Sequence, residues 1–282
     1  MKTDFHCHTN CSDGMLTPSE LMGLAHERGI ELLAITDHDS VEVYKQLPLG
    51  VYENPEAKDK PLQLISGCEF SAVWDGGVVH IVGLGFRLEA IEVKALLARN
   101  AQAREERAER IAAVLEKMGA ENALEGAKRH AGDGTIGRPH FARYLVEIGL
   151  VDSEKKAFRK YLGKGKPGAV KPLWASIPEV VSAIRAAGGV AILAHPTKYD
   201  LTRTKLLRLL DEFCDAGGNV IEVISGKQPS NETQQLVDIA NERQMFCSSG
   251  SDFHQPGQPW AALGEIPVLP KNAKPVVELL AL

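Results

Sequence analysis

The sequence predicts an α/β fold: a distorted seven-stranded (β/α) barrel that carries a helical insertion. Three observations support it. The chain has 282 residues and 44% hydrophobic content, enough for one large core. Short apolar runs alternate with segments of helical periodicity, as in folds built around a mostly parallel sheet. A charged, alanine-rich stretch interrupts this alternation. A doubly wound open sheet is the alternative arrangement.

Seven short apolar runs are the candidate strands. They are Thr3–His6, Leu32–Thr36, Gln63–Ser66, Val78–Gly83, Val190–Ala194, Val220–Ile224 and Met245–Ser248. Two helix starts are also signalled, because Thr17 and Ser176 are each followed three residues later by a glutamate, the pattern of a capping box. The glycine pair at 188–189 is expected to end the second of these helices.

The insertion is expected at residues 89–172, and the barrel at residues 1–88 and 173–282. The stretch from Ile91 to Met118 is rich in Ala, Arg, Glu and Leu, which favours one or two helices. Glycine-rich stretches at 132–134 and 163–168 are expected to be loops. The helices are expected to lie over one face of the sheet.

Charge and composition exclude several classes of function. A net charge of −5 argues against a general nucleic-acid binder. No apolar run approaches about 18 residues, and the N-terminus lacks a signal-like apolar stretch, so no membrane association is expected. Five cysteines without CxxC spacing indicate reduced thiols and a cytoplasmic location. No stable protein partner is expected.

The positions of the histidines carry the functional prediction. Six of them are placed at strand ends, together with three acidic companions: His6, His8, His38, His80, His195 and His254, with Asp13, Glu69 and Asp252. Strand ends on one face of a barrel converge in space. The pairs 6/8 and 252/254 can each present two side chains to one site, because positions i and i+2 of an extended chain point the same way. Imidazoles and carboxylates together suit Mn²⁺, Fe²⁺ or Zn²⁺.

Each motif alone has an ordinary explanation. A single His-x-His is more often a surface feature, Asp37-His38-Asp39 could be a capping turn, and a lone His80 on an apolar strand could be a hydrogen-bonded core residue. Their coincidence favours a metal centre. His26 and His130 lack this setting and are assigned no role in it.

The combined motifs resemble the PHP (polymerase and histidinol phosphatase) family, almost from end to end of the chain. They are His6-x-His8 with Asp13, Thr36-Asp37-His38-Asp39, Gly67-x-Glu69, His80-x-x-Gly83, Ala194-His195-Pro196 and Ser251-Asp252-x-His254. The resemblance implies a distorted seven-stranded barrel, within the amidohydrolase-like group, that holds three divalent ions. Mn²⁺ is the expected metal, with Fe²⁺, Zn²⁺ and Mg²⁺ as alternatives.

The resemblance also implies which residues hold each ion. The first ion would take His6, His8, Glu69 and Asp252. The second would share Glu69 and add His80 and His195. The third would take Asp13, His38 and His254. Asp37 would orient ligands from outside. A hydroxide held between two ions would attack phosphorus, and His195 and Asp252 are the candidate catalytic residues.

The segment Gly137–Arg143 and the pair Lys171-Pro172 resemble a bacterial subgroup that contains 3′,5′-nucleotide bisphosphate phosphatases and a short-RNA 5′→3′ exonuclease. This implies removal of the 3′-phosphate from a nucleoside 3′,5′-bisphosphate such as adenosine 3′,5′-bisphosphate. Arg138, His140 and Lys171 would hold the substrate's phosphates.

Three alternative functions stay open: exonuclease on short RNA, phosphatase acting on a sugar or histidinol phosphate, and a non-enzymatic nucleotide or metal sensor. Arg104 and Arg107 share a helix face that could reach the pocket, although neighbouring glutamates favour a solvated face. Trp74 and Trp174 could stack on a base, but core packing is the more common role.

Overall fold

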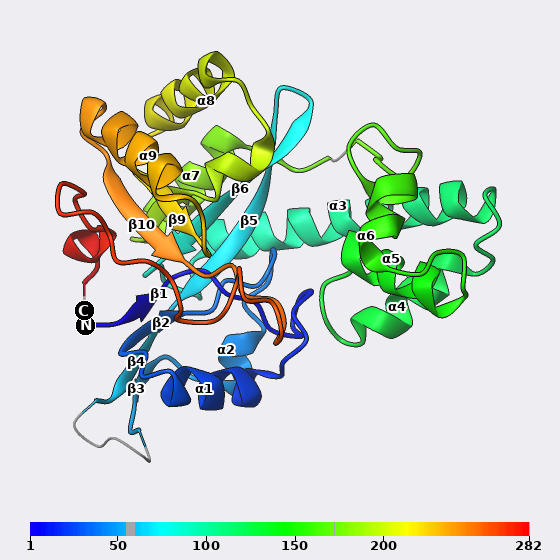
Figure 1. The fold of residues 1–282 in the computed structure, drawn as a ribbon, viewed down its shortest axis with the longest axis horizontal. Helices are drawn as coiled ribbons and strands as arrows, with labels where there is room; N and C mark the ends of the chain where they lie inside the picture. Colours follow the sequence, from blue (N-terminus) through cyan, green and yellow to red (C-terminus); the bar gives the residue numbers. More distant parts are fainter. Residues whose placement is uncertain (55–59, 172, 282) are drawn as a thin grey trace.

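The computed structural model describes residues 1–54, 60–171 and 173–281 (Figure 1). The strands are β1 Thr3–Asp4, β2 Leu32–Ala34, β3 Gly50–Tyr52, β4 Leu62–Ile65, β5 Gly67–Trp74, β6 Gly77–Leu84, β7 Ala175–Ser176, β8 Val190–Leu193, β9 Val220–Ser225 and β10 Phe246–Gly250. The helices are α1 Pro18–Glu27, α2 Val43–Gln46, α3 Ile91–Glu116, α4 Ala123–Ala131, α5 Arg138–Glu147, α6 Glu154–Ala157, η1 Phe158–Leu162, α7 Ile177–Ala186, η2 Pro196–Tyr199, α8 Arg203–Asp215, α9 Ser230–Glu242 and η3 Val276–Leu279. Among the described residues, none of these helices has the length and apolar character needed to cross a bilayer.

The described strands form two sheets, in the orders β1-β2-β4-β3 and β10-β9-β8-β6-β5-β7. Most neighbours are parallel, but β6 lies antiparallel to both β5 and β8. A two-residue turn, Asp75-Gly76, joins β5 to β6 with both residues at positive φ, which suits the twist of a hairpin. The fold is therefore mixed α/β, with an antiparallel strand in the middle of the larger sheet.

Backbone hydrogen bonds connect the two sheets along two lines. Beside β1 and β10, the amide of Asp252 donates to the carbonyl of His6 over 2.7 Å, and that of His8 donates to Phe253 over 2.9 Å. After β2, the amide of Glu69 donates to the carbonyl of Thr36 over 3.2 Å. The candidate metal ligands His6, His8 and Asp252 lie at the first of these junctions between the sheets, and Glu69 lies at the second.

Each predicted apolar run overlaps an observed strand, but β3, β5 and β7 were not predicted as strands. The eight-residue β5 is the important omission. Glu69 was expected at the end of a strand, and it is instead the third residue of β5. All but one of the residues of β5 are buried, including polar Glu69 and Ser71, so the period-2 pattern that marks a half-exposed strand is missing.

Helices cover the sheets on their outer sides (Figure 1). α7, α8 and α9 pack on the larger sheet and share its main hydrophobic cluster, while α1 packs on the smaller sheet. Both predicted capping boxes are confirmed: Thr17 and Glu20 cap α1, and Ser176 and Glu179 cap α7. These helix starts are local features, which explains why the sequence predicts them well.

Residues between α3 and η1 form a helical lobe beside the sheets (Figure 1). The first half of α3 contributes Val93 and Leu96 to the main cluster. Later residues pack on one another in a separate cluster around Phe141, Leu145 and Leu162. Only the start of α3 therefore covers the sheet region, and the expectation that the whole insertion would do so is wrong. Pro172, the expected end of the insertion, lies outside the described residues.

Candidate metal centre

The structure brings all nine predicted metal-ligand residues together. They form four overlapping groups in which the possible ligand atoms lie within 4.8 Å of one another: His8, Asp13, His38 and His254; His6, Glu69 and His195; His6, His8 and Asp252; and His38, Glu69 and His80. Glu69 and His80 lie in β5 and β6 of the larger sheet, and the other seven lie in loops after β1, β2, β8 and β10. Side chains up to 248 positions apart in the sequence therefore share one site.

Glu69 lies at the centre of the cluster with 1% exposure. Its Oε2 faces three nitrogens: His6 Nε2 at 3.2 Å, His8 Nε2 at 3.3 Å and His38 Nδ1 at 3.1 Å. Its Oε1 faces His80 Nδ1 and His195 Nε2, both at 2.8 Å. The two oxygens therefore serve different groups of histidines, as a bridging carboxylate would.

Asp252 and Asp13 flank this centre on either side of His8. Asp252 Oδ1 lies 3.5 Å from His6 Nε2 and 3.4 Å from His8 Nε2. Asp13 Oδ1 lies 3.4 Å from His254 Nε2, and its Oδ2 lies 3.7 Å from His38 Nε2. Each carboxylate thus faces at least two imidazoles.

The arrangement of nitrogen and oxygen atoms in the cluster suits coordination of divalent ions better than hydrogen bonding among the side chains themselves. Six buried atoms make no hydrogen bond to any described residue: His6 Nε2, both ring nitrogens of His8, His38 Nδ1, His195 Nδ1 and Glu69 Oε2. Buried polar atoms are normally satisfied, so such a concentration points to another partner. Two ligands about 2.1 Å from one ion, at about 90–110° to each other, lie about 3.0–3.4 Å apart. The short contacts in the cluster lie close to this range.

Charge in the cluster favours ionised carboxylates. Burial alone would raise the pKa of Glu69, but His38, His80 and His6 hold it well below its ordinary value. The pKa of His8 is raised to about 10, because Asp252 and Glu69 outweigh the lowering effect of burial. For His38, burial prevails and the pKa is lowered to about 3. The same negative field that draws a proton to His8 would draw a metal cation.

The local backbone explains how these side chains are aimed. His6 and His8 point into the cluster while Cys7 between them is fully buried on the other side, as expected for an extended chain. The placement of His80 at a strand end is wrong, because it is the fourth residue of β6 and pairs with Ser71. Since β6 is antiparallel to β8, its first half lies near the end of β8, beside His195.

Three residues at the site have left-handed backbone conformations that are uncommon outside glycine. The φ angles are 47° at Asp39, 27° at His195 and 52° at Asp252. Such conformations cost about 1–3 kcal/mol each and concentrate at functional sites. These conformations turn the chain just after β8 and β10, so that the side chains of His195 and Asp252 face the cluster.

Glu222 is a functional residue that the sequence prediction missed. It is 2% exposed within β9, and its carboxylate accepts hydrogen bonds from His6 Nδ1 over 3.0 Å and from the His195 amide over 2.6 Å. A carboxylate only accepts, so His6 carries its proton on Nδ1 and leaves Nε2 free as a ligand. The available signal was a single glutamate inside an otherwise apolar strand, Val220–Ile224.

Lys198 is a second missed residue. It lies in η2 and forms an ion pair with Asp252 Oδ2, while Asp252 Oδ1 faces the histidines. About half of its side chain is exposed, so its ammonium group lies at the mouth of the cluster. The sequence offered only its closeness to His195.

Asp37 acts on the loop that carries ligands rather than on a ligand side chain. It accepts hydrogen bonds from the Thr9 amide over 2.8 Å, the Thr9 hydroxyl over 2.6 Å and the Ser12 hydroxyl over 2.6 Å. His8 and Asp13 lie at the two ends of this loop. Asp37 therefore fixes their separation.

The predicted phosphate-binding residues have three different environments. Arg138 begins α5, donates to the Leu162 carbonyl over 3.2 Å and lies over the Phe158 ring. His140 is buried, accepts from the Gly137 amide over 2.9 Å, and has a pKa lowered to about 4, mainly by burial. Lys171 is exposed. The structure does not gather them into one contact group.

Arg104 does not lie on a solvated helix face. It is buried and forms an ion pair with Asp39, with Nη2 2.6 Å from Oδ2. Arg104 and Arg107 both lie over the ring of Trp174, which is itself buried. Trp74 contacts Arg208 and Glu212 on α8 instead.

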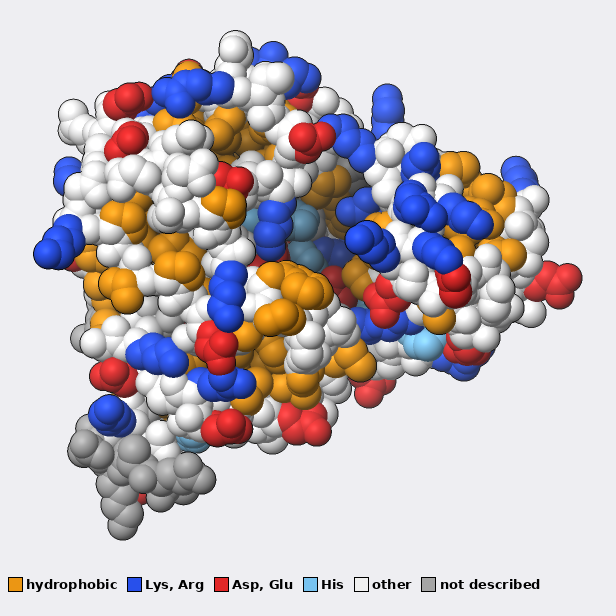
Figure 2. All heavy atoms as spheres, viewed as in Figure 1, with side chains coloured by type: hydrophobic (Ala, Val, Ile, Leu, Met, Phe, Trp, Pro, Cys, Tyr) orange, Lys and Arg blue, Asp and Glu red, His pale blue; other side chains and the backbone are white. Residues whose placement is uncertain are grey.

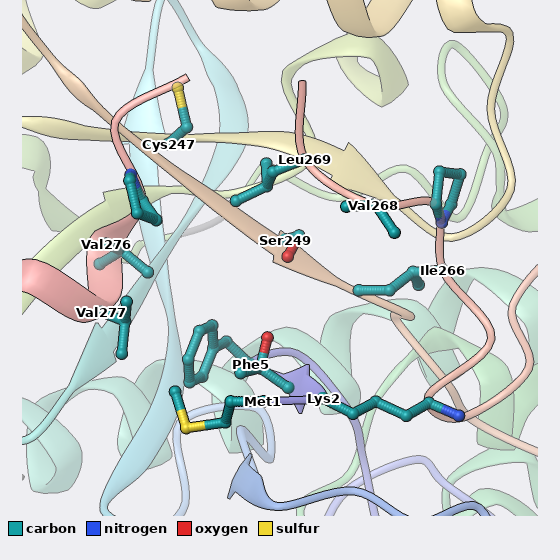
Figure 3. Close-up of a pocket in the computed structure, with 13 residues that line it drawn as sticks. Met1, Lys2, Phe5, Cys247, Ser249, Ile266, Val268, Leu269, Val276 and Val277 are labelled. Atoms are coloured by element: carbon teal, nitrogen blue, oxygen red, sulfur yellow. The ribbon is translucent and has the colours of Figure 1, made fainter. Parts of the chain in front are cut away.

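The histidine cluster opens into a hollow between the main body and the helical lobe. In Figure 2, histidine side chains are visible at the bottom of this hollow, and Lys and Arg side chains lie on its rim. A separate pocket lies beside the start of β1 (Figure 3). Phe5, Ile266, Leu269 and Val276 make it apolar, and it holds none of the candidate ligands, so it does not serve the same chemistry.

Comparisons with known proteins agree with this geometry. Residues 4–105 match the model of the PHP domain. A 5′-3′ exoribonuclease of Haemophilus influenzae is 41% identical, with 98% of each chain covered. A 3′,5′-nucleoside bisphosphate phosphatase of Chromobacterium violaceum is 38% identical, covering 97% of this chain and 94% of the relative. The structure of an amidohydrolase from Chromobacterium violaceum superposes with a TM-score of 0.89 at 38% identity, covering 99% of this chain and 96% of the other. The chain belongs to the PHP family.

Proposed function

We propose that this protein is a metal-dependent phosphatase that removes the 3′-phosphate from nucleoside 3′,5′-bisphosphates. One observation carries the proposal: nine histidine and carboxylate side chains converge, and several of their buried nitrogen and oxygen atoms have no hydrogen-bond partner among the described residues. Three divalent ions, with Mn²⁺ expected, would be held by the three groups of ligands that the resemblance to the PHP family implies. When bound, the ions activate water and neutralise the phosphate's charge.

The fold supports the proposal of a distorted seven-stranded barrel. The bonds from β1 to β10 and from the end of β2 to β5 would close the ring β1-β2-β5-β6-β8-β9-β10. Residues 89–172 would then be an insertion that lies beside the mouth. The hollow in Figure 2, between the main body and the lobe, is the expected entrance for substrate.

Residues at different positions around the cluster would have different roles in the reaction. Glu222 holds His6 in the tautomer that presents Nε2 to the cluster. Lys198, paired with Asp252 at the mouth, would contact non-bridging oxygens of the phosphoryl group. His195 and Asp252 are the candidate catalytic residues, with His195 proposed to assist the departing 3′-oxygen, and Arg138, His140 and Lys171 would hold the substrate's phosphates.

A second function, 5′-3′ cleavage of short RNA, is favoured by one specific observation. Residues 154–171 carry seven Lys or Arg residues and one acidic residue. Six of these cations are exposed: Lys155, Arg159, Lys160, Lys164, Lys166 and Lys171. A local basic segment on an otherwise acidic chain suits several phosphates in a row, and binding there would weaken strongly with salt.

One experiment separates the two functions. Phosphate release from adenosine 3′,5′-bisphosphate is compared with nucleotide release from a 5′-phosphorylated five-nucleotide RNA, both with Mn²⁺. The triple variant Lys160→Ser, Lys164→Ser, Lys166→Ser should lose RNA cleavage, with a smaller salt dependence, and keep bisphosphate turnover. His6→Ala should lose both activities. Full activity of His6→Ala would refute the metal mechanism.

The remaining alternatives predict different outcomes. A phosphatase for sugar or histidinol phosphates would accept substrates without a base or a second phosphate. A sensor would bind nucleotide and release no phosphate. A cytoplasmic location is part of the proposal, supported by five cysteines that form no disulfide.

A further inference from the structure

The helical lobe contacts only some of the ligand-bearing segments. It touches the loop of residues 9–14 and the pair His38-Asp39, which belong to the group Asp13, His38 and His254, and α3 also hydrogen-bonds Ser71 on β5, two residues after Glu69. The hydrogen bonds of Glu222, His195 and Asp252 go to residues of the main body among those described. The centre is therefore supported from two different parts of the fold.

Thr135, between α4 and α5, joins the two ligand loops. Its amide donates to the Cys11 carbonyl over 3.0 Å. Its hydroxyl lies 3.0 Å from that carbonyl and 3.2 Å from the carbonyl of His38. Because the Thr135 amide already donates to the Cys11 carbonyl, the hydroxyl can donate its single proton to the His38 carbonyl. One lobe residue thus fixes the distance between the loops that carry Asp13 and His38.

Two neighbours of Thr135 reinforce this contact. Arg143 on α5 donates from Nη2 to the carbonyl of Asp13 over 2.8 Å. Gly134 lies so close to the 9–14 loop that a Cβ there would be 2.4 Å from the Asn10 carbonyl oxygen. The lobe and the loop therefore meet backbone to backbone, and a larger residue would push them apart.

Arg104 binds the loop after β2, which carries His38, through the carboxylate of Asp39. Its guanidinium and the amide of Asn100, both on α3, bind the carboxylate of Asp39. Asp39 follows His38 directly, and its left-handed φ of 47° needs such support. The carbonyl of His38 and the carboxylate of the next residue, Asp39, are thus held by Thr135 and by α3.

We infer that the lobe assembles one of the metal subsites: Thr135, Arg143 and Arg104 are positioning residues for the ion held by Asp13, His38 and His254. This rests on the proposed function, because it assumes several ions in the cluster. The subsites formed by His6, His195 and Asp252 stand on the main body alone. Loosening the lobe should therefore release one ion selectively and leave the others in place.

The test counts ions rather than turnover. Each protein is loaded with Mn²⁺, passed through a desalting column and analysed for metal per chain, and its affinity is measured by chelator competition. The double variant Thr135→Val, Arg143→Met should lose one ion per chain or bind it at least tenfold more weakly. Thr135→Ser, which keeps the hydroxyl, should retain it. Arg129→Met, which removes an exposed lobe ion pair with Glu147, is the matched control and should equal the wild type.

A double-mutant comparison identifies the ion. Asp13→Asn should lose the same ion, and adding the lobe substitutions to it should cause no further loss. Additional loss, unchanged ion content of the double variant, or simultaneous loss of every ion would each overturn the inference. If the wild type releases no phosphate from any nucleotide, the proposed function fails, while the ion counts still decide the role of the lobe.

Discussion

Replacing Glu222 by glutamine tests whether a buried residue outside the ligand set controls the metal centre. The wild-type carboxylate accepts from both His6 Nδ1 and the His195 amide. A glutamine side chain has one oxygen, so one of these donors would face an NH₂ group. His6 could avoid that clash by moving its proton to Nε2, but this nitrogen would then be blocked as a ligand.

The expected magnitude follows from the lost bond. A hydrogen bond to a charged group contributes about 1.5–3 kcal/mol, and its loss in a ligand-orienting pair weakens metal binding about 10- to 100-fold. Competition with a chromophoric chelator for Mn²⁺ measures this directly. Glu212→Gln is the control, since Glu212 also accepts a bond, from Trp74, but lies on α8 away from the cluster. Unchanged Mn²⁺ affinity in Glu222→Gln would refute the reasoning.

Three further changes have expected outcomes. Arg104→Met leaves the Asp39 carboxylate buried without its ion pair and should lower the free energy of unfolding by about 3 kcal/mol in urea titrations. Burial raises the pKa of Asp39, but the larger opposing effect of Arg104 and the hydrogen bonds leaves it below its ordinary value. The ion pair therefore stabilises the fold above the pKa of the unfolded state, about 4, and this stabilisation is lost as the pH falls below it. A difference in unfolding free energy between wild type and Arg104→Met that stays constant across this pH range would contradict the reasoning. Gly250→Ala would place a Cβ 2.3 Å from that of His6, so about 1–3 kcal/mol of stability and much Mn²⁺ affinity should be lost, whereas Gly23→Ala, with open space around it, should not destabilise. Adding EDTA to Mn²⁺-loaded protein should lower Tm, because each ion present at 100 times its Kd contributes about 2.7 kcal/mol; a Tm indifferent to EDTA would mean that no ion is bound to the native state.

The residues that the structure brings together could be singled out from the sequence because most of them lie in short local patterns. His6 and His8 sit two apart in extended chain, and Asp252 and His254 repeat that spacing after the last strand. The convergence of these four residues follows from the rule that strand ends meet, whereas Glu69 and His80 lie inside strands and reach the cluster from there. Helix starts at Thr17 and Ser176 were predictable for the same reason, since a capping box is complete within four residues.

Features that depend on distant contacts were not predictable in the same way. β5 lacks alternation because nearly all of it is buried, and the antiparallel direction of β6 depends on a two-residue turn between them. In the sequence, Glu222 is a single charge within an apolar strand. Arg104 has glutamate neighbours that favour a solvated helix face. Only their partners, His6 and Asp39, reveal what they do, and these lie 216 and 65 positions away.

The left-handed backbone at His195 and Asp252 has a consequence for the evolution and engineering of this protein. Glycine adopts such φ values without steric penalty, so His195→Gly or Asp252→Gly would relieve part of the conformational energy stored at these turns while removing a candidate metal ligand. Selection for thermal resistance alone would therefore tend to erase the site. Backbone geometry alone thus favours glycine at these two positions, and the side chains found there contact the cluster instead.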